Sequence, residues 1–297
     1  MKKHFLFISA ISLLTLSCSK DNRQYDATGT FEATEITVSS EQNGKLLYFS
    51  VEEGSPVAAG HEVGLVDTVQ LALKARQIGA TRESLAAQRP DVAKQIAATR
   101  QQLAKALQEQ RRYEALVANN AANGKLLDDA RNNVQVLRRQ LEAAVSSLDN
   151  NTRSINGQMS AATIQRMQVI DQLEKCHITS PISGTVLEKY AEQGEFVTAG
   201  KPLFKVADIG RMYLRAYITS AQLADVKIGQ RVKVMSDYGG GKGKTYDGVV
   251  TWIADKAEFT PKSIVTNDER AELVYAVKIA VKNDGGIKIG MYGEVMF

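Results

Sequence analysis

The sequence predicts an elongated protein of mixed α and β class, in which a long helical hairpin divides a small β domain into two halves. Three observations support this fold class. A glycine-containing β motif occurs twice, 140 residues apart. The segment between the two copies has heptad periodicity. The residues after the second copy return to the alternating pattern of strands. Aromatic residues make up only 6% of the chain, which fits an extended shape better than one large core.

Residues 1–17 are typical of a targeting segment. Lys2 and Lys3 precede an apolar stretch, residues 5–16, that is shorter than the about 20 residues a spanning helix needs. Cys18 follows, and the junction resembles a lipoprotein signal in which this cysteine is acylated. Residues 18–32 are then predicted to be the lipidated N-terminus and a polar tether, and stable anchoring requires more than one acyl chain. A plain secretory signal or an uncleaved anchor is the alternative.

The repeated motif covers residues 44–66 and 184–206 and aligns without a gap. Three glycine pairs match: Gly44 with Gly184, Gly54 with Gly194, and Gly60 with Gly200. A repeat at one fixed offset indicates two similar structural units. We therefore expect residues 33–67 and 176–207 to form the two halves of one β domain.

The insert, residues 68–175, is predicted to be an α-helical coiled-coil hairpin. Its second half carries apolar residues at seven-residue spacing: Leu127, Val134, Leu141, Leu148, Ile155, Ala162 and Val169. Its first half has a weaker version of the same spacing: Leu71, Ile78, Leu85, Val92, Thr99, Ala106 and Tyr113. Residues 119–124, NNAANG, are a strong turn signal. Pro90 should kink or break the first arm.

The two half-motifs resemble the halves of a lipoyl/biotinyl domain. In that family a turn between the halves presents a lysine, usually flanked by methionine, for a swinging cofactor. Here the junction reads Asp67-Thr68-Val69-Gln70 and has no such lysine, so no cofactor is expected. A lipoyl-like domain split by a helical hairpin resembles the HlyD-type periplasmic adaptors, also called membrane fusion proteins. Residues 208–297 resemble the small β-barrel domain of these adaptors.

This resemblance implies an adaptor that links an inner-membrane transporter to a TolC-like outer-membrane channel. Such an adaptor forms a homo-oligomeric ring in the periplasm, and Cys18 would attach it by lipid to a membrane, which we expect to be the inner one. The segment 258–281 resembles adaptors of ABC-type exporters and favours an ABC over an RND partner. The alternative is a structural coiled-coil envelope lipoprotein without a transport role, although a spacer has no need of a split lipoyl-like domain.

The hairpin turn carries a further motif of the family. Tips that dock on the outer-membrane channel resemble Arg-x3-Leu-x6-Ser, and Arg112, Leu116 and Asn123 hold this spacing with Asn in place of Ser. The resemblance implies a docking site at these residues. The alternative is that Leu116 is the last core residue of the arm and Asn123 is only an N-cap.

Other chemistry is not expected. Residues 237–245 end in Gly-Lys-Thr like a phosphate-binding loop, but Tyr238 replaces the required first glycine, so this segment is predicted to be a loop between strands. A metal site needs three or four converging ligands, and the chain has only three histidines and one cysteine beyond Cys18, so no metal site is expected. Cys176 is predicted to be a small buried residue at a strand start. Trp252 is expected in the barrel core or rim. No catalytic set or nucleic-acid site stands out, and we expect no enzyme.

Overall fold

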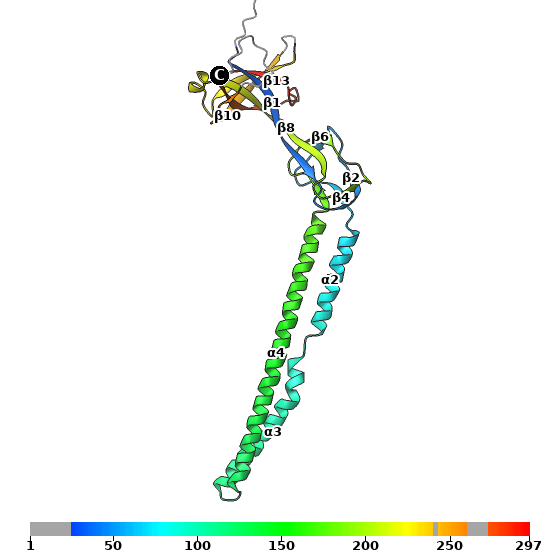
Figure 1. The fold of residues 1–297 in the computed structure, drawn as a ribbon, viewed down its shortest axis with the longest axis vertical. Coiled ribbons are helices and arrows are strands. Elements are labelled where there is room, and N and C mark those ends of the chain that lie inside the picture. The colour runs from blue at the N-terminus through cyan, green and yellow to red at the C-terminus, as the bar shows by residue number, and fades with distance from the viewer. Residues whose placement is uncertain (1–24, 240–242, 260–272) are drawn as a thin grey trace, which may run out of the picture.

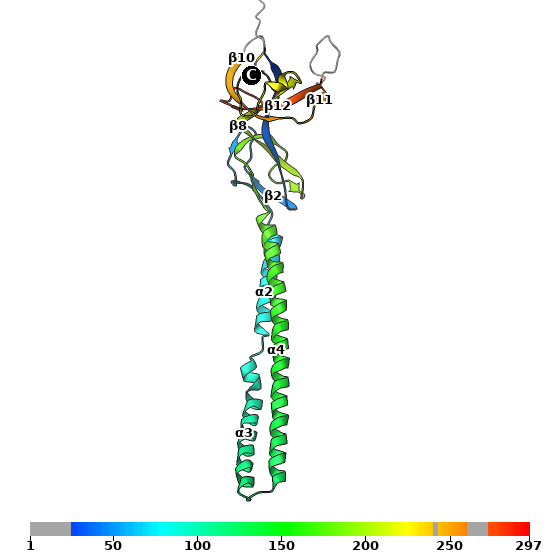
Figure 2. The same cartoon turned by 90° about the vertical axis from the view of Figure 1, so that its left-hand side faces the viewer.

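The computed structural model describes residues 25–239, 243–259 and 273–297. The predicted signal segment and Cys18 lie outside these residues. Figures 1 and 2 show an elongated molecule with three parts in line: a β unit at one end, a second β unit beneath it, and a long helical hairpin. The predicted mixed α and β class is confirmed.

Six strands of the terminal β unit pair in a closed ring. Their order is β12-β10-β9-β13-β1-β8, and a further pairing of β12 with β8 completes the ring. The strands are β1 (Ala27–Ser39), β8 (Pro202–Thr219), β9 (Arg231–Asp237), β10 (Gly243–Ile253), β12 (Leu273–Lys282) and β13 (Tyr292–Met296). The short β11 (Glu258–Phe259) pairs with β12, and the 3-10 turn η1 (Gln222–Ala224) follows β8. Alternate residues point inward, and Phe31, Met212, Leu214, Ile218 and Ile279 are fully buried.

The first strand corrects the predicted tether. Residues 18–32 were expected to be polar tether, but β1 begins at Ala27 and pairs with β13 and β8. Ala27 and Phe31 are buried in the ring. A Cβ at Gly29 would come within 2.0 Å of the Arg215 carbonyl oxygen, so only glycine fits between them. Residues 27–32 therefore belong to the barrel, a role that their short polar sequence does not reveal.

The second β unit is built from the two half-motifs, which exchange strands. The first half supplies β2 (Gly44–Phe49), β3 (Pro56–Val57) and β4 (Glu62–Val66), and the second supplies β5 (His177–Thr179), β6 (Gly184–Lys189) and β7 (Phe196–Val197). Strand β3 pairs with β6, and β7 pairs with β2. The hydrogen bonds are reciprocal, because Gly54 N donates to Val186 O at 2.9 Å and Gly194 N donates to Leu46 O at 2.8 Å.

Each repeated glycine has a steric reason. Gly54, Gly60, Gly194 and Gly200 have φ values between +74° and +95°, a region that costs other L-residues about 1–2 kcal/mol. Gly184 instead allows close packing, because a Cβ there would lie 2.3 Å from the Ala207 carbonyl oxygen. The repeat therefore marks two left-handed turns and one close approach in each half.

The hairpin consists of three helices, α2 (Val69–Ala87), α3 (Val92–Ala118) and α4 (Gly124–Glu174). Both α2 and α3 run beside α4, which is unbroken and about 75 Å long (Figures 1 and 2). The break predicted at Pro90 is confirmed, since α2 ends at Ala87 and Asp91 caps α3 by accepting a hydrogen bond from Lys94 N at 3.1 Å.

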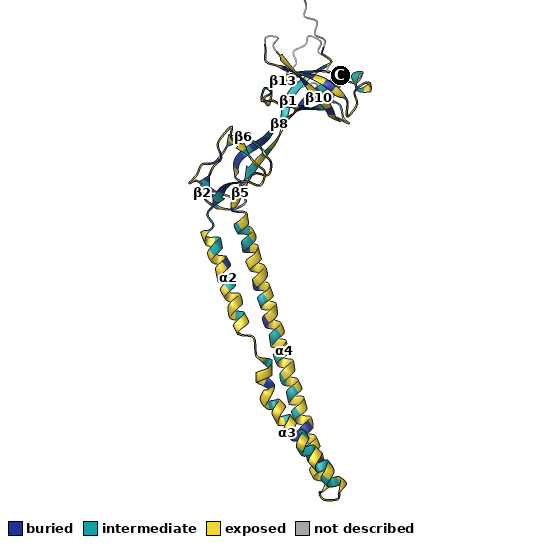
Figure 3. Ribbon diagram, turned by 180° about the vertical axis from the view of Figure 1, so that it is seen from behind, coloured by how far each residue is buried: buried dark blue, intermediate teal, exposed yellow. Residues whose placement is uncertain are grey.

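The hairpin seam is a narrow buried stripe on largely exposed helices (Figure 3). Five of the seven predicted α4 positions are buried, and Leu141 and Leu148 are half-buried. The facing arm differs from the prediction, because its buried residues are Ala75, Ile96 and Ala106, of which only Ala106 was predicted. Ala75 and Ile96 each lie four residues after a predicted position, Leu71 and Val92, so they occupy the companion seam position of the same heptads.

The hairpin base is clamped by the β domain. Strands β4 and β5 pair directly before α2 and after α4, and Val66 N donates to Cys176 O at 2.9 Å. Cys176 is fully buried next to β5, as predicted. Tyr48 Oη donates to Glu62 Oε1, and His177 Nδ1 lies 2.9 Å from Glu62 Oε2. These contacts join β2, β4 and β5 at the point where the hairpin leaves the domain.

The contact with Tyr48, and next that with His177, lowers the pKa of Glu62 from its usual 4.5. Burial and the same hydrogen bond raise the pKa of Tyr48 to about 12. A depressed carboxyl pKa stabilises the fold above the unfolded pKa, and this stability is lost as pH falls through the folded value. We therefore expect a smaller fall in melting temperature between about pH 5 and about pH 3 for Glu62→Gln than for the unmodified chain.

Thermal denaturation followed at several pH values measures this difference. Glu83→Gln is the matched control, because Glu83 is exposed on α2 and has no ion-pair partner in the described part of the chain. Equal acid sensitivity of Glu62→Gln and the unmodified chain would contradict the assignment.

Candidate functional site at the hairpin tip

The end of α3 is closed by a Schellman motif. Asn120 adopts a left-handed conformation with φ of +56°. Ala121 N donates to Leu116 O at 2.8 Å, and Asn120 N donates to Val117 O at 3.0 Å. These bonds satisfy carbonyl groups that the end of a helix leaves free, and Asn tolerates the left-handed region better than most residues. The predicted turn at residues 119–124 is therefore present.

The return helix begins with a side-chain cap. Asn123 Oδ1 accepts a hydrogen bond from Lys125 N at 3.1 Å, and Leu126 N donates to Asn123 O at 3.1 Å. The alternative prediction that Asn123 acts as an N-cap is thus confirmed. A capping role uses the side-chain oxygen and leaves the amide NH2 as a free donor, so it does not exclude docking.

The structure places Arg112 and Leu116 on one face of α3, one helical turn apart. Arg112 is exposed, and its guanidinium has no hydrogen-bond or ion-pair partner among the residues described. Leu116 is half-buried, and Asn123 is exposed after the turn. No hydrogen bond joins the side chains of these three described residues. They are therefore not a bonded cluster: Arg112 and Leu116 share a face of α3, and Asn123 follows the turn.

Four other residues near the tip were not predicted from the sequence. Glu114 on α3 faces Arg131 on α4, with 3.9 Å between carboxylate and guanidinium atoms. Gln110 Nε2 also donates to Glu114 Oε1 at 2.9 Å. Leu126 is 45% exposed beside the buried Leu127. A pattern of apolar residues cannot reveal a pair such as Glu114 and Arg131, because the pairing depends on how the two arms are aligned.

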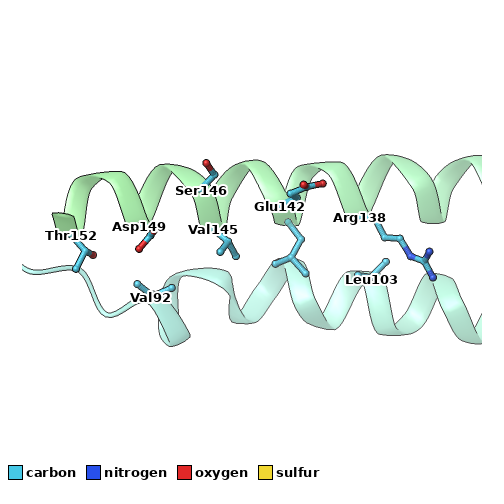
Figure 4. Close-up of a pocket in the computed structure, with 9 residues that line it drawn as sticks. Val92, Leu103, Arg138, Glu142, Val145, Ser146, Asp149 and Thr152 are labelled. Atoms are coloured by element: carbon cyan, nitrogen blue, oxygen red, sulfur yellow. The ribbon is translucent and has the colours of Figure 1, made fainter. Parts of the chain in front are cut away.

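A groove of about 610 Å³ lies between α3 and α4 near the break at Pro90. Figure 4 shows Val92 of α3 near Val145 and Asp149 of α4, and Leu103 of α3 near Arg138 and Glu142. The groove is where the two arms separate as α3 begins. Its apolar walls with a few scattered charges offer no set of groups converging on one reacting atom.

Two further features bear on the type of site. Within residues 25–239, 243–259 and 273–297, no cluster of three or more His, Cys, Asp or Glu side chains could hold a metal ion. In the same ranges, no helix combines the length and apolar character needed to cross a bilayer. The glycine loop after Asp237 joins β9 to the antiparallel β10, although residues 240–242 are not described.

The split β unit identifies the family. Residues 34–209, more than half of the chain, match the family model described as the barrel-sandwich hybrid domain of RND MFP, where MFP denotes membrane fusion protein. The chain belongs to the membrane fusion protein family. Curated relatives of this membrane fusion protein include a UPF0194 membrane protein of Acidithiobacillus ferridurans, 26% identical over 89% of this chain and 83% of the relative. Another, from Yersinia enterocolitica, is 26% identical over 98% of this chain and 96% of the relative.

Solved structures show the same fold at lower sequence identity. MacA from Actinobacillus actinomycetemcomitans has a TM-score of 0.56 and 22% identity to this membrane fusion protein, covering 91% of this chain and 76% of MacA. A membrane fusion protein from Streptococcus pneumoniae has a TM-score of 0.55 and 18% identity, covering 91% of this chain and 96% of that protein.

The Asn123 cap can be tested by substitution. Asn123→Ala removes the acceptor for Lys125 N, so we expect a loss of about 1 kcal/mol in the first turn of α4. Amide hydrogen exchange at Lys125 should become faster, while exchange in the seam around Val134 stays the same. Asn132→Ala, at an exposed position within α4, is the control. Unchanged exchange at Lys125 in Asn123→Ala would show that the cap contributes nothing.

Proposed function

We propose that this chain is the periplasmic adaptor subunit of a tripartite efflux or secretion system, linking an inner-membrane transporter to a TolC-like outer-membrane channel. The observation that carries the proposal is the 51-residue helix α4, which with α2 and α3 projects from a split β unit of the membrane fusion protein family. This arrangement separates the barrel from the tip by the length of the hairpin (Figure 1). Adaptors act by contact with partners and are in general not enzymes.

The place of β1 supports an anchor at the barrel end. Ala27, the first residue of β1, lies in the barrel, and the predicted lipid-bearing Cys18 precedes it by nine residues. A chain of that length spans at most about 30 Å. Lipid attachment at Cys18 would therefore keep the barrel close to the membrane that holds the lipid, with the hairpin directed away from it. This matches an adaptor held at the inner membrane with its tip toward the outer one.

The tip surface supports docking on a channel. Arg112 supplies an exposed guanidinium that has no partner among the residues the structure describes, and Leu116 supplies a half-buried apolar side chain on the same face. The amide group of Asn123 adds a donor after the turn. An apolar centre with polar groups at its edge is the composition expected of a helix-to-helix contact. We propose that these three residues bind the outer-membrane channel.

The class of transporter has two candidates. The resemblance of residues 258–281 favours an ABC-type exporter, but residues 260–272 lie outside the described part of the chain. The matching family model carries RND in its description and favours the second candidate. Purification of the lipidated full chain from crosslinked membranes should recover an ABC transporter. Recovery of an RND pump instead would reject the first candidate.

A structural envelope lipoprotein remains the competing function. It would use the hairpin as a spacer and would need neither the strand exchange of the split β unit nor an exposed arginine at the tip. Export measurements distinguish the two functions, because loss of a spacer does not stop a transporter.

We expect Arg112→Glu and Leu116→Asp to abolish export and crosslinking to the channel without lowering the amount of protein. Arg112→Glu reverses the charge at the edge of the proposed contact, and Leu116→Asp places a carboxylate in its apolar centre, so both changes oppose binding. Arg111→Glu is the matched control, because Arg111 is exposed and adjacent but donates to Leu107 O within its own helix. Normal export in Arg112→Glu, or equal loss in Arg111→Glu, would reject the tip site.

A further inference from the structure

One position of the α2 seam holds a charged residue. Arg82 stands seven residues after Ala75 and four after Ile78, so it occupies the same companion seam position as Ala75, one heptad further along α2. Ala75 is buried, whereas Arg82 is exposed. Among the residues that the structure describes, no carboxylate lies within ion-pair distance of the Arg82 guanidinium. An unpaired charge at an apolar position breaks the pattern of the rest of the seam and marks this level of the hairpin as a candidate site.

A groove of about 520 Å³ opens at the level of Arg82 between α2 and α4. It exists because the side chains that line it near the seam are small. Ala75 and Gly79 of α2 are its least exposed lining residues, and Thr163 lies across on α4. Figure 1 places this part of the hairpin below the split β unit, where α2 runs beside α4. The groove thus has walls from both arms of the hairpin.

Three arginines line this groove, two from α2 and one from α4. Arg76, Arg82 and Arg166 are exposed, and within the described ranges none of them forms a hydrogen bond or an ion pair. Among the described lining residues Glu83 is the one acid, and it has no ion-pair partner in that part of the chain either. The lining therefore carries three formal positive charges and one negative charge. Such a cluster is destabilised by its own repulsion until an anion neutralises it.

The opposite side of the seam differs at the same level. Lys74 and Arg76 lie about 100° to either side of Ala75 on the helix, so they face opposite grooves. The groove on the Lys74 side has a volume of about 460 Å³, and glutamines, among them Gln165 and Gln168, make up half of its lining. Lys74 is the only charged residue among its described lining residues. The arginines are thus concentrated on one side of the hairpin rather than spread around its helices.

We propose that the groove lined by Arg76, Arg82 and Arg166 binds a soluble anion with two or more phosphate or carboxylate groups. A guanidinium donates two parallel hydrogen bonds to such a group, and arginine is favoured over lysine where this geometry is used. Because Arg166 comes from α4 and the other two arginines from α2, one anion with several groups can bridge the two arms. The bound anion neutralises the cluster and holds α2 against α4 at the level where the seam has a charged residue in place of an apolar one.

Titration calorimetry on the detergent-solubilised full chain at low salt tests the site, with pyrophosphate and citrate as probes. We expect saturable binding of at least one probe at one site per copy. Arg82→Gln and Arg166→Gln should each weaken this binding about tenfold or more, because each removes charge-assisted hydrogen bonds. Lys74→Gln is the matched control, because Lys74 is an exposed cation at the same level of α2 in the opposite groove. Absence of saturable binding for both probes, or an equal loss in Lys74→Gln, would overturn the proposal.

Two further measurements separate a specific site from attraction to net charge. Arg82→Lys keeps the charge but loses the guanidinium fork, so it should also weaken binding, and full-strength binding by this variant would overturn the proposal. In the unmodified chain, the bound anion should slow amide hydrogen exchange at Gly79 of α2 and Arg166 of α4 together, while exchange around Ala106 of α3 stays the same. Slower exchange in only one of α2 and α4 would contradict bridging of the arms. None of these measurements depends on export, so the adaptor function and this site can fail separately.

Discussion

Strand exchange between the two half-motifs determines where everything else in the molecule lies. Strand β3 pairs with β6 and β7 pairs with β2, so neither half has a complete set of strand partners alone. The exchange also brings β4 beside β5, which fixes the start of α2 and the end of α4 as neighbours. The two halves of this small domain, residues 33–67 and 176–207, thereby hold the base of a hairpin about 75 Å long. The same small domain is continuous with the barrel, because β1 and β8 run through both units.

Few buried side chains stabilise the packing of the two hairpin arms against each other. These buried residues are either small or occur no more than once per turn. The seam near the base is flanked by amides such as Gln165 and Gln172. The unbroken α4 provides the length, while the break at Pro90 divides the facing arm and opens the groove in Figure 4. Side-chain N-caps stabilise the two helix starts, with Asp91 at the start of α3 and Asn123 at the start of α4.

Much of this architecture follows from local sequence. Repeated glycines, the heptads of α4, Pro90 and the Asn-rich turn each act through nearby backbone or helix geometry, and all were predicted at the right residues. Ala27 and Phe31 were not assigned to a strand, because their burial depends on β8 and β13, which lie far away in the chain. Ala75 and Ile96 were missed because each lies four residues after a predicted heptad position, and only one position per heptad was assigned to the seam of the first arm. The candidate tip residues Arg112, Leu116 and Asn123 came from a spacing motif, and the pairing of Glu114 with Arg131 required the aligned arms.

The coupling of the β domain to the hairpin base can be measured directly by native-state hydrogen exchange. Val197 is fully buried in the exchanged strand β7, and Val197→Ala should destabilise that domain by about 2 kcal/mol. The result expected is a rise of about 30-fold in exchange at Gly54 and Gly194 and, together with them, at Val66 and at Ala72 in the first turn of α2. Faster exchange at Gly54 and Gly194 alone, with Val66 and Ala72 unchanged, would contradict the claim that the exchanged strands hold the hairpin.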